Sequence, residues 1–157
     1  MRRLCLTLLV GLLAFPAAAS SGIATTGDGS LGVSGPTGTG GANGSISLAG
    51  KGVVFGYVAH GTVTVFSYRA DGNAVPTVSG ARMTLSNNAS DVVYSGNGMR
   101  FFFPGGRYQL EIDGVGIDLS AVGNGTVSAL GSGTLDADTV VLALGRVPTG
   151  VSWGKNF

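Results

Sequence analysis

Polar and apolar residues alternate most strictly over Arg107–Asp113. Successive side chains of an extended strand point to opposite faces, so the alternation places Tyr108, Leu110 and Ile112 together on one apolar face. Charged and amide side chains occupy the other face. The pattern predicts a strand with one face buried and the other in solvent.

The segment Met99–Phe103 has the same two-residue period. Every second residue from Met99 onward is expected to face inward, which leaves Arg100 and Phe102 on the outer face. A proline and two glycines follow at Pro104–Gly106, a composition typical of a tight turn. We therefore expect a β-hairpin that joins this segment to Arg107–Asp113.

Other short runs of β-branched and aromatic residues are separated by glycine-rich turn signals, and no stretch has helical periodicity. The further predicted strands are Ile46–Ala49, Val53–Val58, Thr62–Tyr68, Arg82–Leu85, Val92–Tyr94, Ile117–Leu119, Thr126–Leu130 and Thr139–Leu144. The expected fold class is all-β, with roughly 8–10 short antiparallel strands arranged as a compact sandwich or a partly closed barrel.

The glycines form a repeat at fixed spacing. Gly50-Lys51-Gly52 is followed by Gly61-Thr62-Val63, and Gly114-Val115-Gly116 is followed at the same spacing by Gly125-Thr126-Val127. The repeat predicts a strand-turn-strand unit that is used twice, with coincidence in a glycine-rich chain as the alternative. Glycines at such fixed places typically mark bulges or sharp bends of a sheet.

Four of these segments carry a resemblance to a known group of proteins. They are Gly50–Val58, Gly61–Val65, Phe102–Leu110 and Gly116–Gly123. Over roughly Leu48 to Gly131 the chain resembles uncharacterised exported, glycine-rich β proteins of high-GC Gram-positive bacteria. The resemblance implies export and a β architecture, and it implies no mechanism.

The N-terminus has the pattern of a secretory signal peptide. Two arginines at Arg2 and Arg3 precede an uninterrupted apolar run, Leu4–Phe15, and small residues follow at Ala17–Ala19. The run is shorter than the ~20 residues that a membrane-spanning helix requires, so cleavage before Ser20 is expected. The sequence thus predicts a protein that is secreted or associated with the cell envelope.

The rest of the chain divides by composition into three parts. Residues 20–43 are mostly Gly, Ser, Thr and Ala, which predicts a flexible spacer. Residues 44–145 hold the predicted strands and form the expected β domain, and residues 146–157 are interpreted as a C-terminal tail. The signal peptide occupies residues 1–19.

Composition excludes several classes of function. The single cysteine, Cys5, lies in the predicted signal peptide, so the exported part has no disulfide and no thiolate chemistry. Without Arg2 and Arg3, seven basic residues face eight acidic ones, a balance that does not attract nucleic acid. We expect an extracellular or cell-surface partner, no cofactor, and no membrane span after cleavage.

Titratable residues offer weak candidates for a site. Glu111, Asp113 and Asp118 lie close together and could bind calcium or act in hydrolysis, but the alternation puts Glu111 and Asp113 in solvent. His60 is the single histidine and precedes Gly61 in a predicted hairpin turn, so a zinc site or a serine-histidine pair is not expected. The sequence therefore predicts no catalytic residue and no metal site.

Aromatic residues are the candidates for binding. Phe66 and Tyr68 share one face of their predicted strand, and Phe102 points outward from its own. These three side chains are predicted to form an outer patch that stacks on a sugar ring or on a partner surface. The alternative is a core with two layers that covers both faces of the strands.

These features favour an exported, non-enzymatic β domain that acts as a binding or structural module outside the cell. One alternative is a small secreted hydrolase that uses Asp118 or Glu111 with Arg107. A second alternative is an outer-membrane barrel, suggested by the many strands and by the terminal alternation that ends at Phe157.

Overall fold

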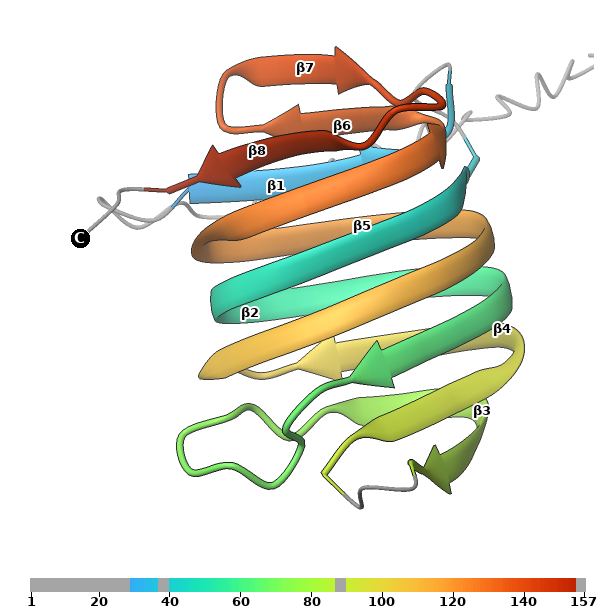
Figure 1. Ribbon diagram of the computed structural model, residues 1–157, viewed down its shortest axis with the longest axis vertical. Helices are drawn as coiled ribbons and strands as arrows, with labels where there is room; N and C mark the ends of the chain where they lie inside the picture. Colours follow the sequence, from blue (N-terminus) through green and yellow to red (C-terminus); the bar gives the residue numbers. More distant parts are fainter. Residues whose placement is uncertain (1–28, 37–39, 87–89, 155–157) are drawn as a thin grey trace, which may run out of the picture.

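The computed structural model describes residues 29–36, 40–86 and 90–154, and in these residues it contains strands and no helix (Figure 1). The all-β prediction is confirmed. The strands are β1 (Gly29–Ser34), β2 (Ala42–Val65), β3 (Thr77–Leu85), β4 (Val92–Phe103), β5 (Arg107–Ser132), β6 (Thr134–Ala137), β7 (Val140–Ala143) and β8 (Thr149–Trp153).

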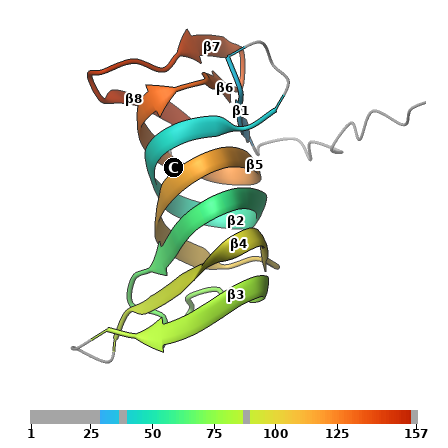
Figure 2. The same ribbon diagram turned by 90° about the vertical axis from the view of Figure 1, so that its right-hand side faces the viewer.

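All eight strands belong to one antiparallel sheet. Its order is β3-β4-β2-β5-β1-β6-β7, and β8 pairs with β5 beside this path. Two of the strands, β2 with 24 residues and β5 with 26, are several times longer than a typical strand and wind around a common axis (Figures 1 and 2). The winding folds the sheet into two facing layers, so the sandwich is the observed architecture.

The pairing of β2 with β5 shows how the coil is wound. Ser45 lies opposite both Asp113 and Leu130 of β5, and Leu48 lies opposite both Leu110 and Val127. The same offset holds along the first half of β2, so the stretch of β5 from Asp113 to Leu130 makes one full turn of the coil. Two successive turns of β5 therefore lie on the two sides of β2. Each half-turn of either strand forms one strand of one layer.

Two layers follow from this register. Layer A comprises β1 and the segments 53–60, 77–79, 98–103 and 115–122. Layer B comprises β8 and the segments 45–51, 62–65, 81–85, 92–95, 107–113 and 124–130. In Figure 1, β8 lies in front and β1 behind.

Paired glycines form the corners between the layers. Gly52 of β2 lies opposite Gly123 of β5, with φ values of 141° and 145° that L side chains rarely adopt. A Cβ on Gly52 would collide with the carbonyl oxygen of Val122, and a Cβ on Gly123 would collide with that of Lys51. The two backbones can approach this closely because both residues lack a side chain. The same opposition occurs at Gly44 with Gly131 and at Gly61 with Gly114.

Aromatic rings of the core lie over inward-facing glycines. The ring of Phe101 reaches the position that a Cβ of Gly56 would take, and the ring of Trp153 does the same at Gly125. Phe101 meets Phe103 edge to face, with ring centroids 6.2 Å apart. The core consists of aliphatic and aromatic residues, and no other polar or charged residue is buried among the described residues.

Several strands that the sequence pattern separates are continuous in the structure. The predicted strands Ile46–Ala49, Val53–Val58 and the start of Thr62–Tyr68 are parts of β2, and Ile117–Leu119 and Thr126–Leu130 are parts of β5. The prediction of short strands throughout is thus wrong for these two, because each intervening glycine bends the strand without ending its hydrogen-bonded ladder.

The glycine repeat is a repeat of corners rather than of turns. Its two copies run antiparallel to each other, so Gly50 lies opposite Gly125 and Gly61 lies opposite Gly114. The predicted turn containing His60 is accordingly absent, and His60 lies within β2 beside the Gly61 corner.

The predicted faces of Met99–Phe103 and Arg107–Asp113 are confirmed, since the inward side chains are buried and Phe102 is exposed. The predicted hairpin between them is wrong. Val54 lies opposite Phe103 and Lys51 opposite Arg107, so β4 and β5 both pair with β2. Pro104–Gly106 is another corner, which carries the chain from layer A to layer B along the same partner strand.

Two predicted domain boundaries also change. Gly29–Ser34, expected in the flexible spacer 20–43, is β1, whose Leu31 and Val33 are buried between β5 and β6. Thr149–Trp153, expected in the C-terminal tail 146–157, is β8, which contributes the fully buried Trp153. Long-range pairing orders segments whose composition alone predicts little burial. The predicted signal peptide lies outside the described residues.

A corner glycine is expected to be irreplaceable. Gly52→Ala combines an unfavourable φ with a backbone collision, so we expect it to destabilise the fold by ~3 kcal/mol or more. Gly105 has a φ of 138° but open space around it, so Gly105→Ala isolates the conformational cost of about 1–2 kcal/mol. Gly145→Ala, also in open space, is the matched control. Urea denaturation measures all three, and equal effects at Gly52 and Gly145 would contradict the corner geometry.

Two polar atoms in the core, Tyr108 Oη and Trp153 Nε1, are buried without a hydrogen-bond partner in the described structure. Tyr108→Phe removes one of them, so unfolding free energy at pH 7 should stay equal or rise by up to ~1 kcal/mol. Burial also raises the pKa of the Tyr108 phenol. Above about pH 10 the unfolded chain releases this proton while the folded chain keeps it, so wild-type stability falls as pH rises.

Tyr108→Phe should therefore flatten the alkaline loss of stability, and denaturant titrations at pH 7 and in the alkaline range measure it. Some loss should remain, because burial, followed by the neighbouring Tyr68, raises the pKa of Tyr94 to about 12. Tyr57→Phe, which removes an exposed hydroxyl, is the control. A clear loss of stability at pH 7 in Tyr108→Phe would show that the hydroxyl has a partner.

Candidate functional site

Exposed aromatic side chains gather on the outer surface of layer A. In β2, Val54 and Val58 are buried, so the residues between them alternate and Phe55 and Tyr57 point outward. Phe55 is 47% exposed and Tyr57 38% exposed. Large apolar side chains at such exposure, grouped on a rigid sheet, are typical of binding surfaces.

Neighbouring strands extend this surface sideways. Phe55 lies opposite Phe102 of β4 on one side and Ser120 of β5 on the other. Tyr57 lies opposite Arg100 and Asp118 in the same way. Each aromatic residue of β2 is thus flanked by side chains from strands that are distant from it in the sequence.

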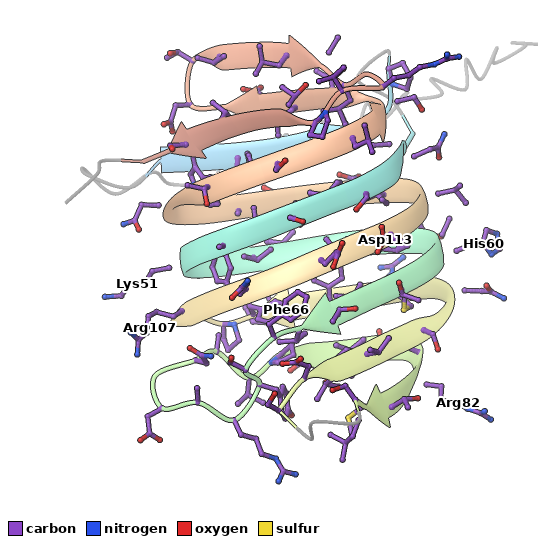
Figure 3. All side chains as sticks on the ribbon, in the orientation of Figure 1. Lys51, His60, Phe66, Arg82, Arg107 and Asp113 are labelled. Carbon is purple, nitrogen blue, oxygen red and sulfur yellow. The ribbon has the colours of Figure 1, made fainter. Side chains whose placement is uncertain are left out.

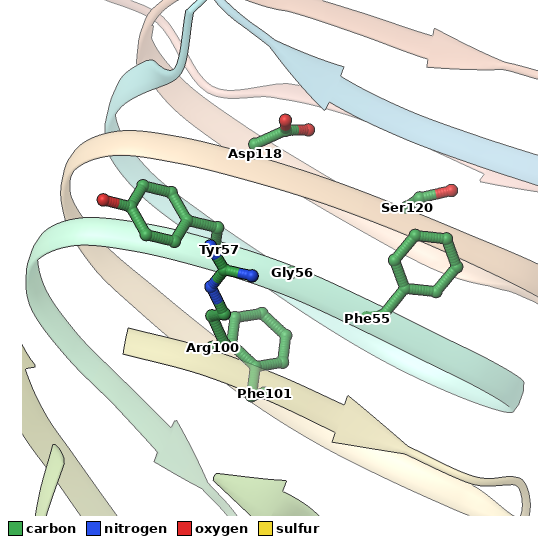
Figure 4. Close-up of a pocket in the computed structure, with 7 residues that line it drawn as sticks. All are labelled: Phe55, Gly56, Tyr57, Arg100, Phe101, Asp118 and Ser120. Atoms are coloured by element: carbon green, nitrogen blue, oxygen red, sulfur yellow. The ribbon is translucent and has the colours of Figure 1, made fainter. Parts of the chain in front are cut away.

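The guanidinium carbon of Arg100 lies 5.8 Å from the centroid of the Tyr57 ring, within the range of a cation–π contact. In Figure 4, Arg100 and Asp118 lie on opposite sides of Tyr57. The arrangement holds a fixed positive charge and a carboxylate next to one aromatic ring.

A hollow of about 510 Å³ lies between these side chains (Figure 4). Gly56 lies at its floor, because its backbone runs between the outward-facing Phe55 and Tyr57 while its own Cβ position points into the core. We call this hollow the aromatic trough, and it is lined by Phe55, Gly56, Tyr57, Arg100, Phe101, Asp118 and Ser120. Its chemistry is that of aromatic faces for stacking, a guanidinium donor, a carboxylate acceptor and a hydroxyl.

The three carboxylates singled out in the sequence are not brought together. Glu111 and Asp113 point outward from layer B, where Asp113 lies opposite Ser45 and Thr62. Asp118 lies beyond the Gly114 corner on the outer surface of layer A. Figure 3 shows Asp113 on the face that carries Phe66. This face is layer B, whereas the trough lies on layer A.

The other polar candidates, Arg107 and His60, form their hydrogen bonds away from the trough. Arg107 donates from a guanidinium nitrogen to the backbone carbonyl of Asp71 at 3.0 Å. His60 lies at the opposite edge of the sandwich (Figure 3), with Nδ1 2.9 Å from the side-chain oxygen of Asn97. Within the part of the chain that the structure describes, no three His, Cys, Asp or Glu side chains gather where they could hold a metal ion.

The predicted aromatic patch of Phe66, Tyr68 and Phe102 does not form. Phe66 follows the end of β2 and lines a shallow groove of about 370 Å³ on layer B. Tyr68 packs against the core. Phe102, 44% exposed, lies on layer A beside the trough.

Phe55 and Tyr57, which the sequence analysis did not propose, take the place of Phe66 and Tyr68. The same two-residue alternation that assigned Phe102 outward would have assigned both, had it been applied to Val53–Val58. Phe55 and Tyr57 lie beside residues of β4 and β5 only because the strands wind as a coil, which the local pattern does not show.

No protein-family model, curated protein or solved structure was found to match this chain. The described residues also include no helix with the length and hydrophobicity needed to cross a membrane.

Proposed function

We propose that this protein is an exported, non-enzymatic binding module that holds a glycan of the cell surface or extracellular matrix in the aromatic trough. The observation that supports the proposal is the pair Phe55 and Tyr57, two exposed rings on one strand with a glycine between them. Aromatic faces pack well against the apolar faces of sugar rings.

The polar neighbours of the rings fit the same ligand class. Asp118 can accept hydrogen bonds from sugar hydroxyls, Arg100 can donate to them, and Ser120 can do both. All three project from strands paired on both sides, so little backbone entropy is lost when a ligand binds.

A binding role is favoured over hydrolysis because glycoside hydrolysis normally uses two carboxyl groups across the scissile bond. One carboxylate, Asp118, lines the trough, and Glu111 and Asp113 face the other side of the sandwich. The secreted-hydrolase alternative needs a carboxylate pair that this geometry does not bring together.

Truncation of a trough ring should weaken glycan binding. In calorimetric titrations with soluble oligomers of glucose, N-acetylglucosamine and mannose, Tyr57→Ala should lower affinity for the bound oligomer by about tenfold, because one stacking contact is lost. Phe66→Ala, which changes an aromatic residue on layer B, is the matched control and should bind as the wild type does. Binding that survives Tyr57→Ala and Phe55→Ala would contradict the proposal, as would oligomer cleavage abolished by Asp118→Asn.

Export is tested separately. When the full chain is expressed in a Gram-positive host, the product should leave the cytoplasm and begin at Ser20, because the apolar run Leu4–Phe15 is followed by the small residues that a signal peptidase recognises. Cell fractionation with intact-mass spectrometry measures both points. Accumulation of the intact precursor in the cytosol would refute the export part of the proposal without affecting the glycan test.

A further inference from the structure

The coil ends at β3, one side of which is unpaired in the part of the chain that the structure describes. Among the described residues β3 pairs with β4 alone, and Figures 1 and 2 show it at the extremity of the stack. Its nine residues contain no lysine or proline, the residues that commonly protect an edge strand from pairing. Arg82, labelled in Figure 3, is its one charged residue.

The hydrophobic core is also open at this end. Met83 lies opposite Tyr94 and Leu85 opposite Val92, so both occupy inward positions of the ladder. Their partners are buried, yet Met83 is 54% exposed and Leu85 46% exposed. One more strand beside β3 would place these two side chains in the core.

A strand that pairs with β3 must bend where β3 bends. β3 passes from layer A to layer B at Gly80, whose φ is 74°. Inside the molecule each corner of one strand lies against a corner of the next, as Gly52 does against Gly123. A straight peptide could therefore pair with only one half of β3.

The order of inward and outward residues makes β3 complementary to itself. In an antiparallel pair of two copies with Gly80 opposite Ala81 of the second copy, Val78 lies opposite Met83, and both face inward. Ser79 lies opposite Arg82 and Thr77 opposite Thr84, all of them outward. Residues opposite each other in an antiparallel pair share a face, so this register keeps every side chain on its own side.

We propose that a second copy of this chain docks on β3, strand to strand about a twofold axis, and continues the sheet and its core from one molecule into the next. A pairing of this kind is self-complementary and closes as a dimer. The other end of the path, β7, has four residues and cannot match the nine of β3. The inference does not depend on the glycan proposal.

The dimer is tested by sedimentation equilibrium of the full chain exported by a secreting host. Wild type should be dimeric at micromolar concentration, since interfaces with a buried apolar centre reach Kd values of roughly 1 µM or below. Met83→Lys puts a charge at the centre of the interface and should raise Kd by at least about 30-fold. Val141→Lys makes the same change on β7, where the apolar side chain is also exposed, and should leave the dimer intact.

A wild type that is still monomeric at about 100 µM, a concentration well above the Kd expected of such an interface, would overturn the proposal. A dimer that survives Met83→Lys but dissociates in Val141→Lys would overturn it too, since the interface would then lie at β7. Circular dichroism checks that each variant is folded.

The register has its own test. In the double variant Ser79→Cys, Arg82→Cys, the two cysteines of one chain lie on different halves of a bent strand. In the proposed dimer, residue 79 of each copy faces residue 82 of the other. Mild oxidation should link residue 79 of one copy to residue 82 of the other, a bond that peptide mass spectrometry identifies. A dimer in wild type without this cross-link in the variant would overturn the proposed pairing.

Discussion

The close approach of two backbones at paired glycine corners is the constraint on which this fold depends. At Gly52 and Gly123 each strand turns from one layer to the other. A Cβ on either glycine would collide with a backbone carbonyl oxygen of the opposite strand. The ladder between β2 and β5 continues through the bend. Two strands can therefore wind as a coil and build both layers of a sandwich without loops.

The geometry of the coil also produces the candidate site. Each turn places β2 between successive passages of its partners, so outward residues of β4, β2 and β5 line up in rows across layer A. One row contains Phe102, Phe55 and Ser120, and the next contains Arg100, Tyr57 and Asp118. The hollow that we assign to a ligand lies between the side chains of these two rows, with the backbone of Gly56 at its floor.

A wound sheet that does not close on itself has two ends. At the β3 end the last inward side chains lack the neighbour that each interior strand has on both sides, which leaves Met83 and Leu85 exposed. Repeating architectures share this property, because each unit is stabilised by its neighbours and a terminal unit needs a cap. In this protein we propose that a second copy supplies that cap.

The sequence by itself determined the all-β class, the faces of Met99–Phe103 and Arg107–Asp113, and the glycine repeat, since period-two alternation and glycine spacing are local properties. The sequence could not show that the glycines between the predicted short strands bend one continuous strand instead of ending it. Val58 and Val63 are both buried, although their positions in the chain differ by an odd number. The alternation of inward and outward side chains therefore changes phase near Gly61, and it cannot be followed through that corner from the sequence. Tertiary structure alone decided the length of each turn of the coil, the ordering of β1 and β8, and the meeting of Tyr57 with Arg100 and Asp118, because each depends on which strand lies beside which.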